Sequence, residues 1–233
     1  MQVDVADPGA VRSAVSWAMD SWTEPPSGVL LVGDGHHDPL GHTTSVPSLI
    51  FPWSSLGYND TLVADRYVMA HEDADLPELP IARLPVQTGA ELLTCTAKLL
   101  AQSSGENQGA WTNRMLFIAD DEWGQGDNYD ELYHTVDTER LAEEMAPRRI
   151  ERVKFYLIEY PWPPSGTHPK KPEAREDLLV LLSEGFGAVC YLGHGAAEQI
   201  AHEGAMYGSD VSLLENGGRL PVSFWATCDE GHF

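Results

Sequence analysis

Basic residues are scarce in this sequence of 233 residues. It holds 14 lysines and arginines against 36 aspartates and glutamates, which gives a formal net charge of -22 at pH 7. Binding nucleic acid through its phosphates needs a basic face, so the charge balance argues against that class of function. A basic or cationic partner suits this composition better.

Cysteines are also few, and long apolar runs are missing. The three cysteines, Cys95, Cys190 and Cys228, are too few and too scattered for a disulfide framework or a zinc site with paired ligands. No run of 18 apolar residues occurs, so the sequence predicts no membrane span in this segment. The N-terminus lacks the basic start and apolar core of a secretory signal. With a disulfide framework and a zinc site excluded, the functional role left for one of these cysteines is that of a reactive thiol.

Hydrophobic residues make up 42% of the chain, which is enough for a buried core. In the first half we expect an amphipathic helix over 7–22, a strand over 29–32, a long surface loop to about residue 60, short strands over 67–69 and 81–84, and a helix from 88 to about 102 that opens on a capping box. Turn-forming residues over 103–109 mark the best internal boundary. We therefore predict subdomains 1–109 and 110–233.

The second half alternates strand and helix patterns more regularly. We expect strands over 115–119, 153–158, 188–192 and 222–227, helices over 130–146 and 173–184, an exposed loop over 161–172, and a short helix over 210–215 capped by Ser209. This alternation predicts a mainly parallel sheet covered by helices on both faces, which is a three-layer α/β/α fold.

Two of the expected strands end in residues that can do chemistry. The strand over 188–192 runs into Gly193, His194 and Gly195, and the strand over 222–227 runs into Cys228. In an open α/β sheet, ligands and catalytic groups gather beyond the carboxyl ends of the strands. If these strands are neighbours, His194 and Cys228 lie on one rim.

Such a pair suits nucleophilic catalysis. A thiolate is the nucleophile, and a nearby imidazole stabilises it and later protonates the leaving amine. Gly193 and Gly195 would let a substrate backbone approach, and their amides could donate to a developing oxyanion. Judged by spacing alone, Cys228 as a buried thiol at a strand end is an equally good interpretation.

The two motifs also carry a resemblance. Residues 191–195 read Tyr-Leu-Gly-His-Gly and residues 226–231 read Ala-Thr-Cys-Asp-Glu-Gly, and they resemble the catalytic motifs of the gingipain family of cysteine peptidases. Segments 29–35, 75–86 and 216–221 resemble the same family, in the same order. Together these segments span nearly the whole chain.

The resemblance implies a caspase-like fold with two α/β subdomains and an endopeptidase that acts through a thioester acyl-enzyme. By matching position, His194 is the acid–base residue and Cys228 is the nucleophile. The amides of Gly195 and Cys228 would then lie at the oxyanion hole. The substrate would be a protein or peptide.

Acidic residues have two roles in this family, and the resemblance implies both here. One acid near the end of an earlier strand orients the histidine, and the candidates are Asp120, Asp121 and Glu122, of which we favour Asp121. Another acid binds the arginine or lysine before the cleaved bond. Glu131 or Asp130 is the nearest match for that second acid.

The resemblance further implies export by a bacterium to an extracellular or cell-surface location. It implies no organic cofactor and allows calcium as a structural ion, for which the acidic turn 72–75 offers oxygen ligands. Family domains continue with further strands and helices beyond the cysteine. We therefore expect this chain, which ends at Phe233, to be part of a longer protein.

Two other functions match parts of the sequence. One is a noncatalytic binding or assembly domain of a larger exported protein. The other is a metal-dependent hydrolase, because the side chains of Asp34, His36, His37 and Asp38 suit a transition metal. His134 lies on an expected helix and faces either the active-site rim or the core.

Overall fold

The computed structural model describes residues 8–34, 49–55, 58–64, 78–121, 123, 131–162 and 170–228. The chain divides into two compact units, residues 1–97 with Phe233 and residues 98–232. The division falls within a helix, whereas the sequence suggests a boundary after it, near residue 109, and that boundary stays a prediction. No helix in the described ranges is long and apolar enough to cross a membrane.

The first unit contains a helix and a small parallel sheet. Helix α1 (Pro8–Ser21) is followed by strand β1 (Val29–Val32), which pairs in parallel with β4 (Ile81–Leu84). Val11 of the helix and Leu31 of the strand are buried together. These elements match the predicted ranges because local apolar spacing specifies them. The strand expected over 67–69 lies outside the described residues.

The capping box predicted at the start of the next helix is confirmed. Helix α2 runs over Gly89–Ser104. The Glu91 amide donates to the Thr88 hydroxyl at 3.2 Å, and the Thr88 amide donates to the Glu91 carboxylate at 3.1 Å. The two bonds satisfy amides that the first turn of a helix leaves unpaired.

The long loop expected up to residue 60 is wrong in its last part. Strands β2 (Leu49–Ser55) and β3 (Tyr58–Ala64) form an antiparallel hairpin. A loop was expected because Pro, Gly, Ser and His residues dominate this segment, although it also contains a short apolar run. In the hairpin, Pro52 lies opposite Thr61, and a two-stranded sheet has only edge strands, which tolerate proline.

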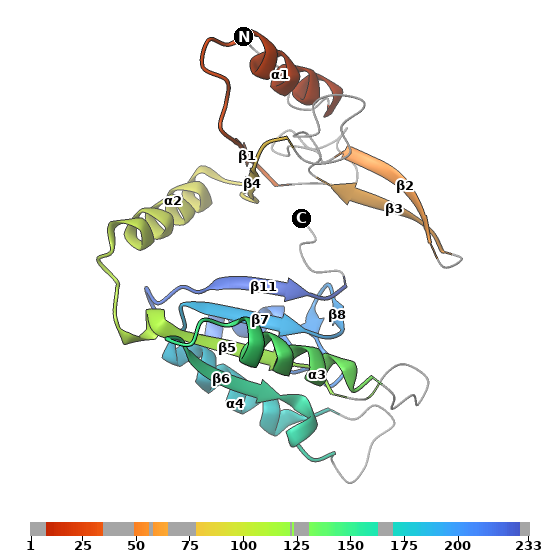
Figure 1. The fold of residues 1–233 in the computed structure, drawn as a ribbon, viewed down its shortest axis with the longest axis vertical. Coiled ribbons are helices and arrows are strands. Elements are labelled where there is room, and N and C mark those ends of the chain that lie inside the picture. The colour runs from red at the N-terminus through yellow and green to blue at the C-terminus, as the bar shows by residue number, and fades with distance from the viewer. Residues whose placement is uncertain are drawn as a thin grey trace. The chain divides into compact units, whose positions relative to one another are not determined.

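The second unit is built on a four-stranded parallel sheet, as Figure 1 shows. Its order is β11 (Val222–Ala226), β7 (Ala188–Leu192), β5 (Arg114–Ala119) and β6 (Glu151–Tyr156). Every pair in this sheet is parallel. The predicted mainly parallel sheet is therefore confirmed, and each of its strands overlaps a predicted one.

Helices cover both faces of this sheet (Figure 1). Helix α4 (Pro172–Glu184) supplies Leu178 to a core that includes Leu116 and Tyr191. Helix α3 (Tyr133–Arg140) packs on β5 and β7 and continues as one π-helical turn, Leu141–Met145. Successive strand residues point to opposite faces, so neighbouring buried residues of β5 serve both helix layers.

Short elements complete this unit. They are the 3₁₀ turns Ala110–Asn113, Leu157–Glu159 and Gly208–Leu213 and a small antiparallel sheet of β8 (Gly195–Ala196), β9 (Gln199–Ile200) and β10 (Met206–Tyr207). The helix expected over 210–215 with Ser209 as its cap is thus a 3₁₀ turn that begins two residues earlier, at Gly208. Its cap is Tyr207, whose amide donates to Asp210 at 2.9 Å.

Candidate active site

The carboxyl ends of three parallel strands meet at one rim of the second unit. Leu192 at the end of β7 pairs with Ala226 of β11 on one side and with Ala119 of β5 on the other. The pairing continues past the strands, because the Gly193 amide donates to the Ala226 carbonyl at 3.3 Å. Residues that follow these strands, including His194 and Cys228, therefore lie on the same rim, as the sequence predicts.

The two glycines beside His194 are required by close packing. A Cβ on Gly195 would lie 2.6 Å from the Cys228 carbonyl oxygen. A Cβ on Gly193 would lie 2.5 Å from the Tyr191 hydroxyl. A larger residue at position 195 would push the histidine and cysteine segments apart, and one at position 193 would clash with Asp120 and Tyr191, so these glycines have a structural role. Their predicted role at the oxyanion stays a prediction.

Buried groups hold the backbone of His194. Its amide donates to the Asp120 carboxylate at 2.8 Å. Its carbonyl accepts from the Tyr191 hydroxyl at 2.6 Å and from the Ala201 amide at 2.8 Å. Asp120 and Tyr191 are fully buried. The loop after β7 is thus anchored from several sides, which limits where the imidazole can lie.

Glu131, which precedes α3, bonds to the imidazole. Its Oε2 forms a hydrogen-bonded ion pair with His194 Nε2, and both side chains are partly exposed. A carboxylate on one ring nitrogen fixes the orientation of the ring. The other nitrogen, Nδ1, is then left for a reacting group. The sequence suggested Glu131 or Asp130 as a substrate-binding acid. Asp130 lies outside the described residues.

Asp121, the acid favoured for orienting His194, is placed differently. Its carboxylate forms a fully buried ion pair with Lys171 at 2.5 Å. Its other oxygen accepts from the Trp123 amide at 2.8 Å. Among the described residues, the acid bonded to the imidazole is Glu131 rather than Asp121. Of the other candidates, Asp120 binds the backbone of His194, and Glu122 lies outside the described residues.

Two further histidines flank the imidazole. The ring of His134 meets it edge-on at 5.1 Å between centroids, and the ring of His202 lies at 4.5 Å. His134 is buried at the end of α3 nearest the rim. Both alternatives for His134 therefore hold, since it lies in the core and beside the rim. Burial, followed by the positive charge of His194, lowers the pKa of both flanking histidines.

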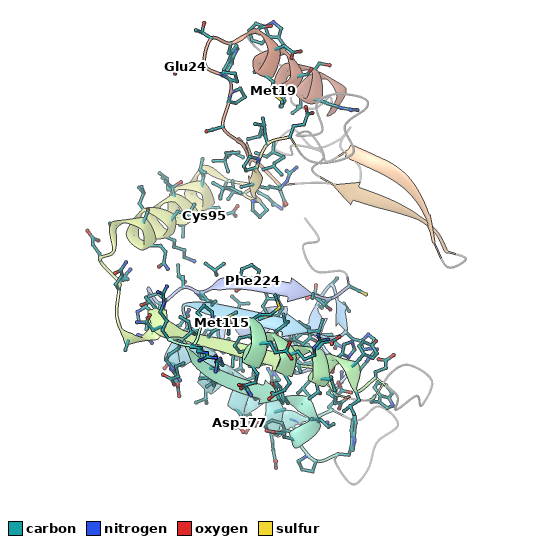
Figure 2. All side chains as sticks on the ribbon, in the orientation of Figure 1. Met19, Glu24, Cys95, Met115, Asp177 and Phe224 are labelled. Atoms are coloured by element: carbon teal, nitrogen blue, oxygen red, sulfur yellow. The ribbon has the colours of Figure 1, made fainter. Side chains whose placement is uncertain are left out.

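The three cysteines differ in exposure. Cys228 is exposed, whereas Cys190 and Cys95 are half-buried. Burial raises the pKa of Cys190, which makes its thiolate scarcer near neutral pH. Cys95 lies on α2 in the first unit (Figure 2). The exposure of Cys228 does not fit the alternative interpretation of a buried strand-end thiol.

A buried charge cluster lies next to the rim, and the sequence did not reveal it. Oxygens of Asp120, Asp121 and Glu203 lie within 4.8 Å of one another. Lys171 joins them through its ion pair and also donates to the Leu157 carbonyl at 2.7 Å. The segment 161–172 was expected to be an exposed loop, but Lys171 is buried. A lysine in a Pro-Lys-Lys-Pro tract carries no sequence signal of burial.

Glu203 should make folding stability depend on pH. It is 1% exposed, and neither carboxylate oxygen has a hydrogen-bond partner among the described residues. Burial, helped by the negative charges of Asp121 and Asp120, raises its pKa from 4.5 to about 8, while Lys171 acts in the opposite direction. The folded state therefore keeps a proton on Glu203 that the unfolded chain has already released.

We expect the stabilisation contributed by protonated Glu203 to be fully present below the pKa of this residue in the unfolded chain. This contribution should be lost as the pH rises toward the pKa in the folded state. The slope from this group is at most about 1.4 kcal/mol per pH unit. Glu203→Gln should flatten the dependence between about pH 5 and 8, because it cannot ionise. Urea unfolding midpoints of both proteins across this range measure the difference. Parallel curves would contradict the expectation.

The fold of the chain is similar to that of solved gingipain structures. The crystal structure of the Arg-specific cysteine proteinase gingipain R (RgpB) matches with a TM-score of 0.67 at 20% identity, over 97% of this chain and 46% of that one. The complex of the Porphyromonas gingivalis RgpB pro- and mature domains matches with a TM-score of 0.65 at 19% identity, over 95% of this chain and 46% of that one. The chain thus spans about half the length of these solved chains.

The sequence comparisons identify the family directly. No curated protein sequence matches the chain. The model of peptidase family C25 matches residues 2–233, which is nearly the entire sequence. The resemblance inferred from the histidine and cysteine motifs is therefore confirmed, and the chain belongs to peptidase family C25, a family of cysteine peptidases.

Proposed function

We propose that this chain carries the catalytic residues of a cysteine endopeptidase, with Cys228 as nucleophile and His194 as acid and base. One observation carries the proposal. The exposed thiol and the imidazole follow adjacent parallel strands, and a carboxylate binds one nitrogen of the imidazole. A thiol, an imidazole and a carboxylate on one rim are the groups that an activated nucleophile needs.

The proposed reaction has two stages. The Cys228 thiolate attacks the peptide carbonyl, and protonated His194 gives its proton to the leaving amine as the carbon–nitrogen bond breaks. The product is a thioester between Cys228 and the acyl part of the substrate. Water then attacks this thioester, His194 takes the proton of the water, and the thiolate is released as the carbon–sulfur bond breaks.

The backbone around the two residues supports the charged intermediates. The amides of Gly195 and Cys228 are our candidates for donors to the oxyanion, and donors held rigid before the reaction stabilise it most. The tight packing of Gly195 on Cys228 and the anchoring of His194 by Asp120 favour such rigidity. Glu131 would stabilise the imidazolium that forms when His194 holds the proton.

The cleavage specificity, the location and the binding of calcium are also proposals. Cleavage after arginine or lysine is supported by the Arg specificity of gingipain R and by the net charge of -22 of this chain. If Glu131 serves His194, another acid must bind the basic side chain. An extracellular or cell-surface location is supported by the same similarity. Calcium as a structural ion stays a prediction, because segment 72–75 lies outside the described residues, as do His36, His37 and Asp38 of the rival metal site.

Thiol alkylation tests the proposed dyad without knowledge of the substrate. The full-length protein is treated with iodoacetamide near neutral pH, and the labelled cysteines are mapped by mass spectrometry. We expect rapid labelling of Cys228, because an imidazole nearby raises its thiolate fraction. His194→Ala should slow that labelling at least about tenfold.

Cys95 and Cys190 are controls within the same molecule. Their labelling should be slow and should not respond to His194→Ala, because both are half-buried, which limits access of the reagent whether or not the imidazole is present. Equal, slow labelling of Cys228 in both proteins would overturn the peptidase proposal and favour a noncatalytic binding domain. With rapid labelling established, a peptide library reports the residue preferred before the cleaved bond.

A further inference from the structure

Two histidines and an aspartate converge at the rim. Three possible ligand atoms lie within 4.8 Å of one another, one from each of Asp120, His134 and His194. Asp120 and His134 are buried, whereas the His194 side chain is 29% exposed. The cluster therefore reaches from the interior of the unit to the solvent, and an ion could enter it past His194.

The two ring nitrogens of His134 have the hydrogen-bonding pattern of a metal-binding histidine. Its Nδ1 is buried and has no hydrogen-bond partner among the described residues. Its ring bonds to the backbone of Asp121, and since Nδ1 has no partner, that bond belongs to Nε2. In the neutral ring, a donor at Nε2 leaves a lone pair at Nδ1. Metal-binding histidines are commonly oriented in this way.

His194 has the same arrangement. Its Nε2 is bound by the Glu131 carboxylate, so Nδ1 is the ring nitrogen that is left to bind a metal ion. A carboxylate on the outer nitrogen orients a histidine and raises its basicity as a ligand. Asp120 completes the set. Among the described residues, one of its oxygens accepts from the Asp121 amide and the other from the His194 amide, and the Tyr191 hydroxyl also bonds to this carboxylate. These three bonds leave one of the roughly four acceptor positions of a carboxylate open.

We propose that Asp120, His134 and His194 form a binding site for a divalent transition metal such as Zn²⁺, and that the bound ion inhibits the peptidase. Two imidazoles and one carboxylate are a ligand set that zinc accepts, with water in a fourth position. Ligand atoms around tetrahedral zinc lie roughly 3.3 Å apart, so the side chains must close by up to about 1.5 Å. Rotation of the partly exposed His194 ring can supply part of this movement.

Inhibition follows from the chemistry of the imidazole. A nitrogen bound to the metal can neither accept a proton nor return it to the leaving amine. The inhibitory part of the inference rests on the proposed function, because it requires His194 to be the acid–base residue. The binding part does not, because it requires only the geometry of the three side chains.

Calorimetric titration of full-length Cys228→Ala protein with ZnCl₂ tests the binding part. Removing the thiol excludes a site made by Cys228 and His194. We expect one zinc ion per chain, and we expect His134→Phe in the same background to weaken binding at least about a hundredfold, since it removes one of three ligands. Phenylalanine keeps the ring volume. His134→Gln keeps a hydrogen-bond donor and serves as a second variant if phenylalanine prevents folding.

His202→Phe is the matched control, because His202 also lies against His194 but is not among the three ligands. It should leave zinc affinity within about threefold, since it removes no ligand. No binding to Cys228→Ala protein, or equal affinity with and without His134, would overturn the inference.

The inhibitory part is tested in the chain with Cys228 intact. Zinc should inhibit peptide hydrolysis, a chelator should reverse the inhibition, and His134→Phe should remove it. Inhibition that survives His134→Phe would overturn this part. Zinc binding by a chain without peptidase activity would leave the metal site standing and overturn only the proposed function.

Discussion

Glu131→Gln is expected to lower kcat for peptide hydrolysis by about 10²–10⁴-fold, with little change in KM. Glutamine has the shape of glutamate but not its charge, so it cannot stabilise protonated His194. Its amide can also donate, which would favour a ring form that accepts at Nε2. Steady-state kinetics with a peptide that carries arginine before the cleaved bond measure both constants.

The same experiment separates the two roles considered for this residue. If Glu131 instead binds the basic side chain of the substrate, the variant should raise KM for arginine peptides with a smaller effect on kcat. Glu144→Gln is the control, because Glu144 is exposed and its ion pair is with Arg140. A variant at Glu131 that behaves like the one at Glu144 would exclude both roles.

Lys171→Met is expected to destabilise the protein by about 3–5 kcal/mol. The substitution leaves Asp121 buried without its cation, beside Asp120 and Glu203. The cost comes from the uncompensated charge, because methionine is similar in length and fills much of the same space. Denaturant unfolding near neutral pH, followed by tryptophan fluorescence, measures the change.

Two variants make the interpretation specific. Lys154→Met removes a lysine whose partners Glu139 and Glu143 are far more exposed, and it should cost about 1 kcal/mol or less. Asp121→Asn added to Lys171→Met removes the orphaned charge and keeps an acceptor for Trp123. The double variant should regain most of the lost stability. It can also be measured if the single variant Lys171→Met does not fold. Equal effects at Lys171 and Lys154 would contradict the burial argument.

The strands and helices of the second unit were predictable because local patterns specify them. Short apolar runs such as 188–192 can be buried only as strands or helix segments, and the glycines that follow end the element. Once strand and helix patterns alternate, the carboxyl ends of parallel strands must share an edge. The positions of His194 and Cys228 followed from these local facts.

The hairpin over 49–64 was missed for the opposite reason. Its stability depends on pairing between two segments, and loop-forming residues surround the short apolar run at the start of the first segment. Cross-strand hydrogen bonds between residues such as Leu49 and Ala64 exist only when the turn closes. A count of loop-forming residues therefore gave the wrong result.

The sequence by itself determined the family, the parallel sheet and the rim that holds a thiol and an imidazole. Only the tertiary structure decided which acid meets which cation. Glu131 and His194 are 63 residues apart, and Asp121 and Lys171 are 50 residues apart. Adjacent acids such as Asp120 and Asp121 look alike in sequence, yet one binds the backbone of His194 and the other binds a buried lysine. Charge pairing depends on distance and burial in three dimensions, and local spacing does not determine either.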